Sequence, residues 1–208
     1  MKCRPIIAIL RGINPSEAEA VSNTLIEEGI TIIEVPLNSP KPLLSLETMV
    51  KCHGNKAIFG AGTVLNVDQV KRVKNTGSKL IVSPNCDIAV IKKTKDLNMI
   101  SIPGCFTATE AINALHNGAD GLKFFPAFQL GTKSFEALSA ILPQNLMSFA
   151  VGGIDALNFK DWLNVNISGF GLGSSLYKPG MDLIEIRKKT RDFVKLFDIA
   201  SNNKIIDF

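Results

Sequence analysis

Eight short apolar runs recur along this chain, and each is followed by a turn signal and then by a helical pattern. Their spacing is roughly 20 to 30 residues, which accommodates one strand, one short helix and two tight loops. The runs are rich in Ile, Val, Leu and Phe and show little alternation, as is typical of parallel strands covered on both faces. The expected strands are residues 6–10, 31–35, 57–60, 80–82, 100–102, 121–124, 147–151 and 169–172.

This series of strand–helix units predicts an α/β protein, a single-domain (β/α)8 TIM barrel that spans residues 1–208. No Pro/Ser-rich linker or charge block interrupts the chain, and 46% hydrophobic residues suffice for an ample core. The alternative is an open doubly wound sheet. That fold favours a Gly-x-Gly-x-x-Gly turn after the first strand, whereas this chain has Arg11-Gly12-Ile13-Asn14-Pro15 there.

Several helix boundaries carry local signals. Thr107 with Glu110 predicts a capping box, and Asn14, Asn66 and Asp155 are expected to cap the helices that follow them. The glycines expected to end helices are Gly29, Gly77 and Gly118. The last helix is expected near residues 182–200, with Leu183, Ile186, Phe193, Leu196 and Phe197 on its buried face.

Composition excludes several classes of partner. The net charge is +4, and no dense Lys/Arg run with interleaved aromatic residues occurs, so we expect no nucleic-acid binding. The first apolar run is too short for a signal peptide or a membrane span, which predicts a cytoplasmic protein with no membrane partner. The four cysteines form no C-x-x-C pair and only two histidines are present, so no metal site is expected.

A lysine, Lys123, lies inside the apolar stretch Leu122-Lys123-Phe124-Phe125-Pro126. A lone ammonium in such surroundings either finds a partner or gives up its proton. A neutral amine is a nucleophile that can condense with a ketone to form a Schiff base. The alternative is a lysine at a strand end whose ammonium extends into water.

A glutamate, Glu34, lies in a similar apolar run near the end of the second expected strand. Burial should raise the pKa of its carboxyl group unless a cation compensates. Beside a lysine it could transfer protons, which Schiff-base chemistry requires repeatedly. The alternative is a buried ion pair between Glu34 and Lys123 without a chemical role, although such pairs are a poor source of stability.

Further candidates stand at strand ends, where the active sites of (β/α)8 barrels lie. Arg11 follows the first strand and could hold a carboxylate bidentately. Thr63 follows the third strand and could bond a carboxylate or hydroxyl, and Pro84 follows the fourth. The alternatives are a surface arginine for Arg11 and a helix-entry turn for Thr63.

Two glycine-rich turns follow the seventh and eighth strands, and they contain Gly152, Gly153, Gly173, Ser174 and Ser175. In (β/α)8 enzymes these two loops often bind phosphate through backbone N–H groups. Glycine lets the backbone approach a ligand closely. The alternative is that the glycines serve only tight turns.

The remaining conspicuous residues favour structural interpretations. His53 is expected to face solvent in a turn at a helix end, and His116 to close a helix, so a histidine-based mechanism is not favoured. Trp162 and Tyr177 are expected to pack in the core, and Cys105 is expected to be a small buried side chain.

Eight segments carry a family resemblance. They are Ile9-Leu10-Arg11-Gly12, Glu34-Val35-Pro36-Leu37-Asn38-Ser39, Gly60-Ala61-Gly62-Thr63-Val64-Leu65, Val82-Ser83-Pro84, Pro103-Gly104, Leu122-Lys123-Phe124-Phe125-Pro126-Ala127, Val151-Gly152-Gly153 and Gly171-Leu172-Gly173-Ser174. In this order they resemble the class I 2-keto-3-deoxy-6-phosphogluconate/galactonate (KDPG/KHG-type) aldolases, from about residue 6 to residue 198.

The resemblance implies a small (β/α)8 barrel, usually a homotrimer, with no metal or organic cofactor. It also implies retro-aldol cleavage of a phosphorylated 2-keto-3-deoxy sugar acid to pyruvate and glyceraldehyde 3-phosphate. In that scheme Lys123 forms the Schiff base and Glu34 relays protons. The residues implied for the pyruvate carboxylate and its pocket are Arg11, Thr63, Pro84 and Phe125, and those for the phosphate are Gly152, Gly153, Gly173 and Ser174.

Two departures from the gluconate-type pattern favour the galactonate-type branch of the family. Gluconate-type enzymes carry Thr-Leu-Arg-Thr shortly after the glutamate, where this chain has Asn38 within Pro36-Leu37-Asn38-Ser39. They carry a threonine before the phosphate Gly-Gly pair, where this chain has Val151. Loss of that hydroxyl can shift the preference between substrates that differ in configuration at C4.

Three alternatives remain open at this point. The first is cleavage of the gluconate epimer or of 4-hydroxy-2-oxoglutarate. The second is a sugar-phosphate isomerase or epimerase, which would use the same glycine turns but no imine. The third is a non-catalytic protein that binds a phosphorylated metabolite.

Overall fold

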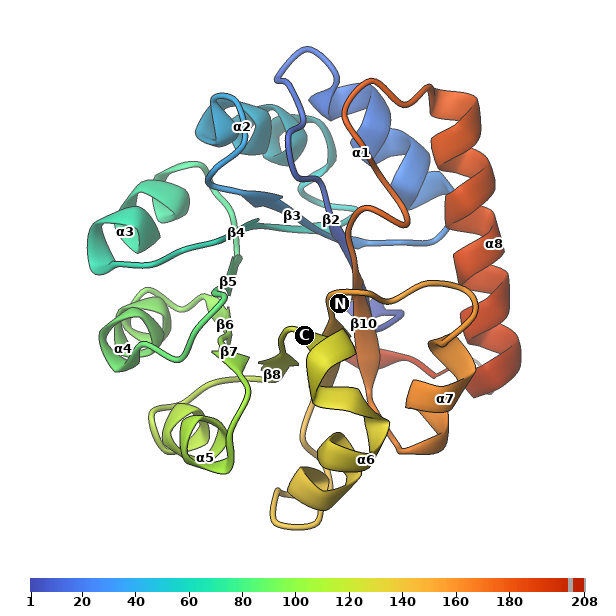
Figure 1. Cartoon of the computed structure of the whole chain (residues 1–208). Coiled ribbons are helices and arrows are strands. Elements are labelled where there is room, and N and C mark those ends of the chain that lie inside the picture. The colour runs from blue at the N-terminus through green and yellow to red at the C-terminus, as the bar shows by residue number, and fades with distance from the viewer. Residues whose placement is uncertain (202–203, 208) are drawn as a thin grey trace.

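The predicted apolar runs form a ring of parallel strands surrounded by helices in the computed structural model, which describes residues 1–201 and 204–207 (Figure 1). The ring strands are β2 (Ile6–Ile9), β3 (Ile32–Pro36), β4 (Ile58–Gly62), β5 (Leu80–Val82), β6 (Ile100–Ile102), β7 (Gly104–Cys105), β8 (Leu122–Phe124), β9 (Ser148–Val151) and β10 (Gly169–Leu172). Apart from β7, which was not expected, their bounds agree with the expected strands to within about two residues, the usual uncertainty of an element end.

The ring closes through a strand that is interrupted at Pro103. The hydrogen-bonded order is β6-β5-β4-β3-β2-β10-β9-β8-β7, so β6 and β7 stand at its two ends. These two segments follow each other in the chain and are separated only by Pro103, which has no N–H group to donate to a neighbouring strand. Counting them as one strand gives an eight-stranded barrel, which confirms the predicted (β/α)8 fold.

The helices of the described residues lie outside the ring (Figure 1). They are α1 (Ala18–Glu27), α2 (Pro42–His53), α3 (Val67–Asn75), α4 (Ile88–Asp96), α5 (Ala108–His116), α6 (Ala127–Ser139), α7 (Phe159–Asn164) and α8 (Leu183–Ser201). The Thr107–Glu110 capping box and the Asn66 cap are present as predicted. Gly29, Gly77 and Gly118 follow helix ends with positive φ angles, also as predicted.

Four expectations about individual residues are wrong. Asn14 and Asp155 do not cap helices; their bonds with Glu17 and Asn158 stabilise turns that precede α1 and α7. Leu183 is 43% exposed because it lies at the N-terminal end of α8, beyond the packed face. His53 is buried rather than solvent-facing, because α2 turns its last residue toward the core.

Side chains of the strands alternate between two apolar layers. Ile6 and Ala8 point outward and pack with the helices, whereas Ile7 and Ile9 point inward and belong to a cluster inside the barrel. Trp162, Tyr177 and Cys105 are buried in the outer layer, as expected. A short antiparallel pair, β1 (Lys2–Cys3) and β11 (Ile206–Asp207), adds Cys3 and Ile206 to the inner cluster near the start of β2.

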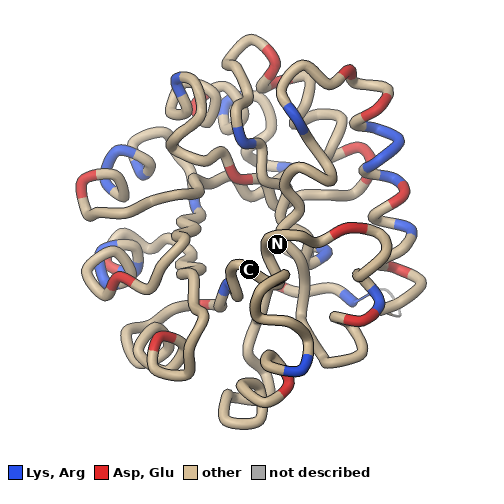
Figure 2. Tube along the Cα trace, viewed as in Figure 1, with Lys and Arg blue, Asp and Glu red and all other residues tan. Residues whose placement is uncertain are grey.

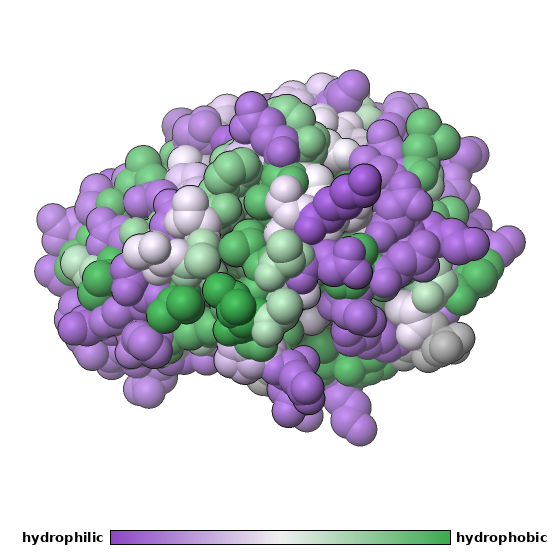
Figure 3. All heavy atoms as spheres, turned by 60° about the horizontal axis from the view of Figure 1, so that its bottom comes forward, coloured by the Kyte–Doolittle hydropathy of each residue, from purple (hydrophilic) through white to green (hydrophobic). Residues whose placement is uncertain are grey.

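Charged residues lie mostly on the outer helices and loops and seldom on the strands (Figure 2). On the face shown in Figure 3, polar residues cover most of the surface, and apolar residues form one larger group left of the centre and smaller groups elsewhere. The barrel interior holds the apolar inner cluster, so a charged side chain that points into it lies in surroundings that oppose its ionisation.

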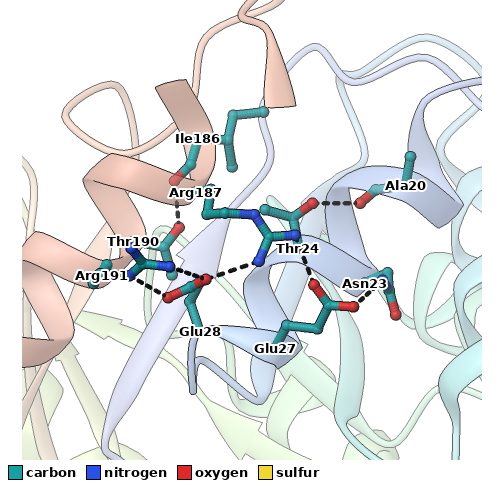
Figure 4. A network of polar contacts seen from close by, with 9 residues as sticks. All are labelled: Ala20, Asn23, Thr24, Glu27, Glu28, Ile186, Arg187, Thr190 and Arg191. Atoms are coloured by element: carbon teal, nitrogen blue, oxygen red, sulfur yellow. Dashed lines mark hydrogen bonds and ion pairs between the residues drawn. The ribbon is translucent and has the colours of Figure 1, made fainter. Parts of the chain in front are cut away.

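Ion pairs join the first and last helices. Arg187 of α8 contacts Glu27 and Glu28 of α1 at 2.6 and 2.8 Å, and Arg191 contacts Glu28 at 2.9 Å (Figure 4). These contacts join α8 to α1, its neighbour in the ring of helices.

Candidate active site

Glu34 points into the barrel near the C-terminal ends of the strands. It pairs in register with Ile9 and Gly60 and follows the inward-facing Ile32 by two residues, so it lies on the same face. Only 2% of its surface is exposed, and its Oε2 atom has no hydrogen-bond partner among the described residues. Burial raises the pKa of Glu34 to about 7, although the charges of Lys123 and Arg11 oppose that rise.

A glycine makes room for this carboxylate. A Cβ atom on Gly62 would overlap the Glu34 carboxylate, so the site requires a residue without a side chain at the end of β4. The backbone N–H of Gly62 also interacts with the carboxylate and lowers its pKa. The position of Glu34 therefore explains the glycine at the end of the motif Gly60-Ala61-Gly62.

Lys123 points into the same end of the barrel. Its neighbours Leu122 and Phe124 belong to the outer layer, so the lysine between them faces inward, and it is 6% exposed. Its Nζ atom lies 4.6 Å from the centre of the Phe125 ring, a cation–π distance. Burial lowers the pKa of the Lys123 ammonium, Glu34 opposes that effect and Arg11 adds to it.

Lys123 and Glu34 influence each other without forming an ion pair. Each shifts the other's pKa electrostatically, yet no contact within 4.0 Å joins them among the ion pairs of the described residues. The alternative of a closed buried ion pair does not describe this arrangement. The amine and the carboxylate instead face one space that a small molecule can enter.

That space is a cavity of about 840 Å³ at the C-terminal ends of the strands. Its wall consists of Ile9, Arg11, Gly12, Glu34, Lys123, Phe125, Val151, Gly152, Gly153, Ile154, Asp155, Gly171, Gly173, Ser174, Ser175, Tyr177, Lys178, Pro179 and Lys189. Nine of the twelve residues singled out from the sequence therefore meet in one place: Arg11, Glu34, Lys123, Phe125, Val151, Gly152, Gly153, Gly173 and Ser174.

The other three, Asn38, Thr63 and Pro84, are not among the residues that line the cavity. Asn38 instead contacts a residue that does, because its Oδ1 atom accepts a hydrogen bond from Arg11 Nη1 at 2.5 Å. Thr63 follows Gly62 with a φ angle of +57°, a left-handed conformation that is strained for a β-branched residue. Such strain clusters at functional sites, so it draws attention to this turn beside Glu34.

The two glycine-rich turns offer backbone donors to the cavity. Within the described part of the chain, the N–H groups of Gly152, Gly153, Gly173 and Ser174 donate to no backbone carbonyl. Gly152 and Gly153 have φ angles of +94° and +72°, which allow two successive N–H groups to face outward together. This is the arrangement that binds oxyanions in proteins.

Several cavity residues were not predicted from the sequence. Tyr177 packs as expected, but it also lines the cavity, and Asp155, Lys178 and Lys189 do so as well. The position of Lys178 after the last strand was an available signal, since barrel sites are built from these loops. Lys189 lies well inside α8, and no local pattern distinguishes it from the other basic residues of that helix.

Two absences concern other kinds of site. The described residues hold no group of three or more His, Cys, Asp or Glu side chains placed to bind a metal ion. Over the same residues, no helix combines the length and apolarity that crossing a bilayer demands.

Comparison with known proteins agrees with this geometry. Residues 1–192 match the family model described as KDPG and KHG aldolase. The chain is 49% identical to a probable 2-dehydro-3-deoxy-6-phosphogalactonate aldolase of Rhizobium meliloti (strain 1021), over 94% of this chain and 92% of the relative. It is 42% identical to the 2-dehydro-3-deoxy-6-phosphogalactonate aldolase of Escherichia coli (strain K12), over 93% and 94%.

A solved structure described as native KDPGal superimposes with a TM-score of 0.93 at 42% identity, covering 95% of this chain and 96% of that one. Three findings lead to one assignment: a family model that spans most of the chain, similar relatives over nearly its full length, and the same barrel in a solved structure. The chain belongs to the KDPG and KHG aldolase family.

Proposed function

We propose that this protein is a class I aldolase that cleaves 2-dehydro-3-deoxy-6-phosphogalactonate to pyruvate and D-glyceraldehyde 3-phosphate. One observation carries the proposal: the amine of Lys123 is buried in a cavity at the barrel mouth, beside Glu34 but without a direct ion pair. Family membership and the names of the relatives favour the same reaction.

Lys123 acts as the nucleophile. Its lowered pKa raises the fraction of neutral amine, whose nitrogen attacks the C2 carbonyl of the substrate to form a carbinolamine. Loss of water gives a protonated imine, which accepts the electron pair of the C3–C4 bond when that bond breaks. The aldehyde leaves, the enamine is protonated at C3, and water hydrolyses the resulting imine to pyruvate and free amine.

Glu34 transfers the protons that these steps require. A group that must both accept and donate protons works best when its pKa is near the working pH, and burial raises the pKa of Glu34 to about 7. The neutral form donates a proton to the carbinolamine hydroxyl, which then leaves as water. The ionised form accepts the proton of the C4 hydroxyl, directly or through a water molecule, as the C3–C4 bond breaks.

Arg11 and Thr63 bind the carboxylate of the pyruvoyl group, and Pro84 and Phe125 shape its pocket. Arg11 lines the cavity and offers a forked set of donors that suits a carboxylate. Asn38 holds this arginine through the bond to Nη1. Thr63 lies next to Gly62, in the turn that follows β4.

Gly152, Gly153, Gly173 and Ser174 bind the phosphate through their N–H groups, which have no backbone acceptor within the described chain. Val151 lines the cavity directly before Gly152 and has no hydroxyl to offer the substrate. A substrate whose C4 hydroxyl needs no partner there is favoured, which supports preference for the galacto epimer.

Several properties stay predictions: a cytoplasmic homotrimer, no metal or organic cofactor, no nucleic-acid or membrane partner, and residues 1–208 as one domain. Of these, the trimer and the absence of a cofactor rest on the resemblance alone. Exposed apolar side chains such as Phe128 and Leu157, at 67% and 91% exposure, are the kind of surface that subunit contacts cover.

The test combines covalent trapping with substrate comparison. Borohydride with pyruvate should leave a permanent adduct on Lys123, and Lys123→Met should leave none. The kcat/KM for pyruvate release from the galacto epimer should equal or exceed that from the gluco epimer. A strong gluco preference would keep the aldolase but reject the subclass, and no adduct with no pyruvate would favour an isomerase or a non-catalytic protein.

A further inference from the structure

The basic residues of α8 lie in different surroundings. Arg187 and Arg191 face α1 and are occupied by Glu27 and Glu28 (Figure 4). Lys188 points outward, with its side chain 76% exposed and paired with Asp192 at 2.9 Å. These three residues have evident roles in joining helices or in solubility.

Lys189 differs because it lines the active-site cavity, although it lies more than a turn inside α8. Helix side chains lean toward the N-terminus of their helix, so the long side chain of Lys189 reaches up to the loop after β10. There its Nζ atom donates to the carbonyl oxygen of Ser175 at 3.3 Å. Its side chain is 32% exposed.

The ammonium of Lys189 has donors to spare. An ammonium carries three protons, and the Ser175 carbonyl accepts one of them. Glu185 forms an i,i+4 ion pair with Nζ at 3.6 Å, which is longer than a hydrogen bond, and its side chain is half exposed, so the pair is weak. Neither group therefore saturates this cation.

The wall beside Lys189 also holds polar groups without partners. Ser175 and Tyr177 line the cavity, and their hydroxyl oxygens are buried and have no hydrogen-bond partner within the described residues. Tyr177 is only 3% exposed. Buried polar groups are almost always satisfied, so two residues with unsatisfied hydroxyls in this wall favour a polar ligand beside it.

We propose that Lys189 is a specificity-determining residue that contacts the phosphate of the substrate, next to the glycine turns at residues 152–153 and 173–174. This inference deepens the proposed function and rests on it. A dianionic phosphate held by backbone N–H groups gains a charge-assisted hydrogen bond from Lys189, whereas pyruvate, which has no phosphate, gains nothing from it. Lys189 therefore acts on the phosphorylated end of the substrate and not on the imine chemistry.

The experiment compares Lys189→Met with Lys188→Met, which removes a neighbouring lysine of the same helix that lies outside the cavity. Two quantities are measured for each: the KM for the phosphorylated keto acid, and the pyruvate concentration that half-saturates inactivation by borohydride. We expect Lys189→Met to raise the KM about five- to tenfold, as for a partly exposed charged hydrogen bond. The pyruvate value should not change, and Lys188→Met should change neither.

Two further readouts separate phosphate contact from loop support. Lys189→Arg, which keeps the charge, should have a KM close to that of the wild type. Raising the salt concentration should increase the wild-type KM more than the KM of Lys189→Met. An unchanged KM in Lys189→Met, or an equal loss for pyruvate and for the phosphorylated substrate, would overturn the inference. If the proposed function itself were wrong, the outcome would differ, because the wild-type protein would then form no adduct with pyruvate.

Discussion

Replacing Glu34 with Gln should stabilise the protein in neutral solution while abolishing its proposed catalysis. Burial raises the pKa of this carboxyl from 4.5 to about 7, so the folded state resists an ionisation that the unfolded state allows. The difference is about 2.5 pKa units, and each unit corresponds to about 1.4 kcal/mol. The carboxyl therefore costs the fold about 3 kcal/mol once it is ionised.

The sign of the effect follows from the two pKa values. Below about pH 4.5 the carboxyl is neutral in both states and costs nothing. Between about pH 4.5 and pH 7 the unfolded chain releases the proton and the folded protein keeps it, so wild-type stability falls relative to that of Glu34→Gln. Above pH 7 the difference between the two proteins stays constant.

Urea unfolding of both proteins, at one protein concentration and at several values between about pH 4 and pH 8, measures this difference directly. Glu110→Gln is the contrast. Burial raises the pKa of Glu110, but hydrogen bonds from Phe106 and Thr107 outweigh this effect and lower the pKa overall. The substitution should therefore decrease the free energy of unfolding at pH values above that pKa. A Glu34→Gln difference that does not vary with pH would refute the reasoning, because Glu34 would then ionise like an exposed carboxyl.

Four further predictions follow from the site. Gly62→Ala should lower kcat about a hundredfold, because its methyl group displaces the Glu34 carboxylate; an unchanged single-turnover rate would contradict this. Asn38→Ala should raise the half-saturating pyruvate concentration about threefold to tenfold by releasing Arg11, and it should have no effect in an Arg11→Met background. The kcat/KM for cleavage should rise with pH and level off above about 7 as Glu34 ionises, and a flat profile would exclude Glu34 as the base. Val151→Thr should move the ratio of kcat/KM values toward the gluco epimer, and an unaltered ratio would remove Val151 from the specificity assignment.

Local signals explain why the barrel could be predicted from the sequence. Each strand is a short apolar run covered on both faces, and the Thr107–Glu110 capping box and Gly118 mark one helix start and one helix end by interactions within a few residues. For His53, where the expectation was wrong, tertiary packing was decisive. His53 is buried because of how α2 packs, which no local pattern at residues 51–55 contains.

The site residues, like the fold, were predictable from the sequence only in part. A lysine and a glutamate inside apolar runs are visible in the sequence, because burying a charge is costly wherever the run packs. That Lys123 and Glu34 share one cavity without an ion pair depends on strand register and on the space left at Gly62.

The sequence by itself determined the series of strands and helices, the barrel they imply and the two ionisable residues inside it, because these depend on the order of apolar and polar residues along the chain. Only the tertiary structure decided which residues meet at the cavity. Lys188 and Lys189 are neighbours in the sequence, yet one faces solvent and the other the cavity. The reason is that successive helix residues point about 100° apart, and the packing of α8 against the barrel selects which of them points inward.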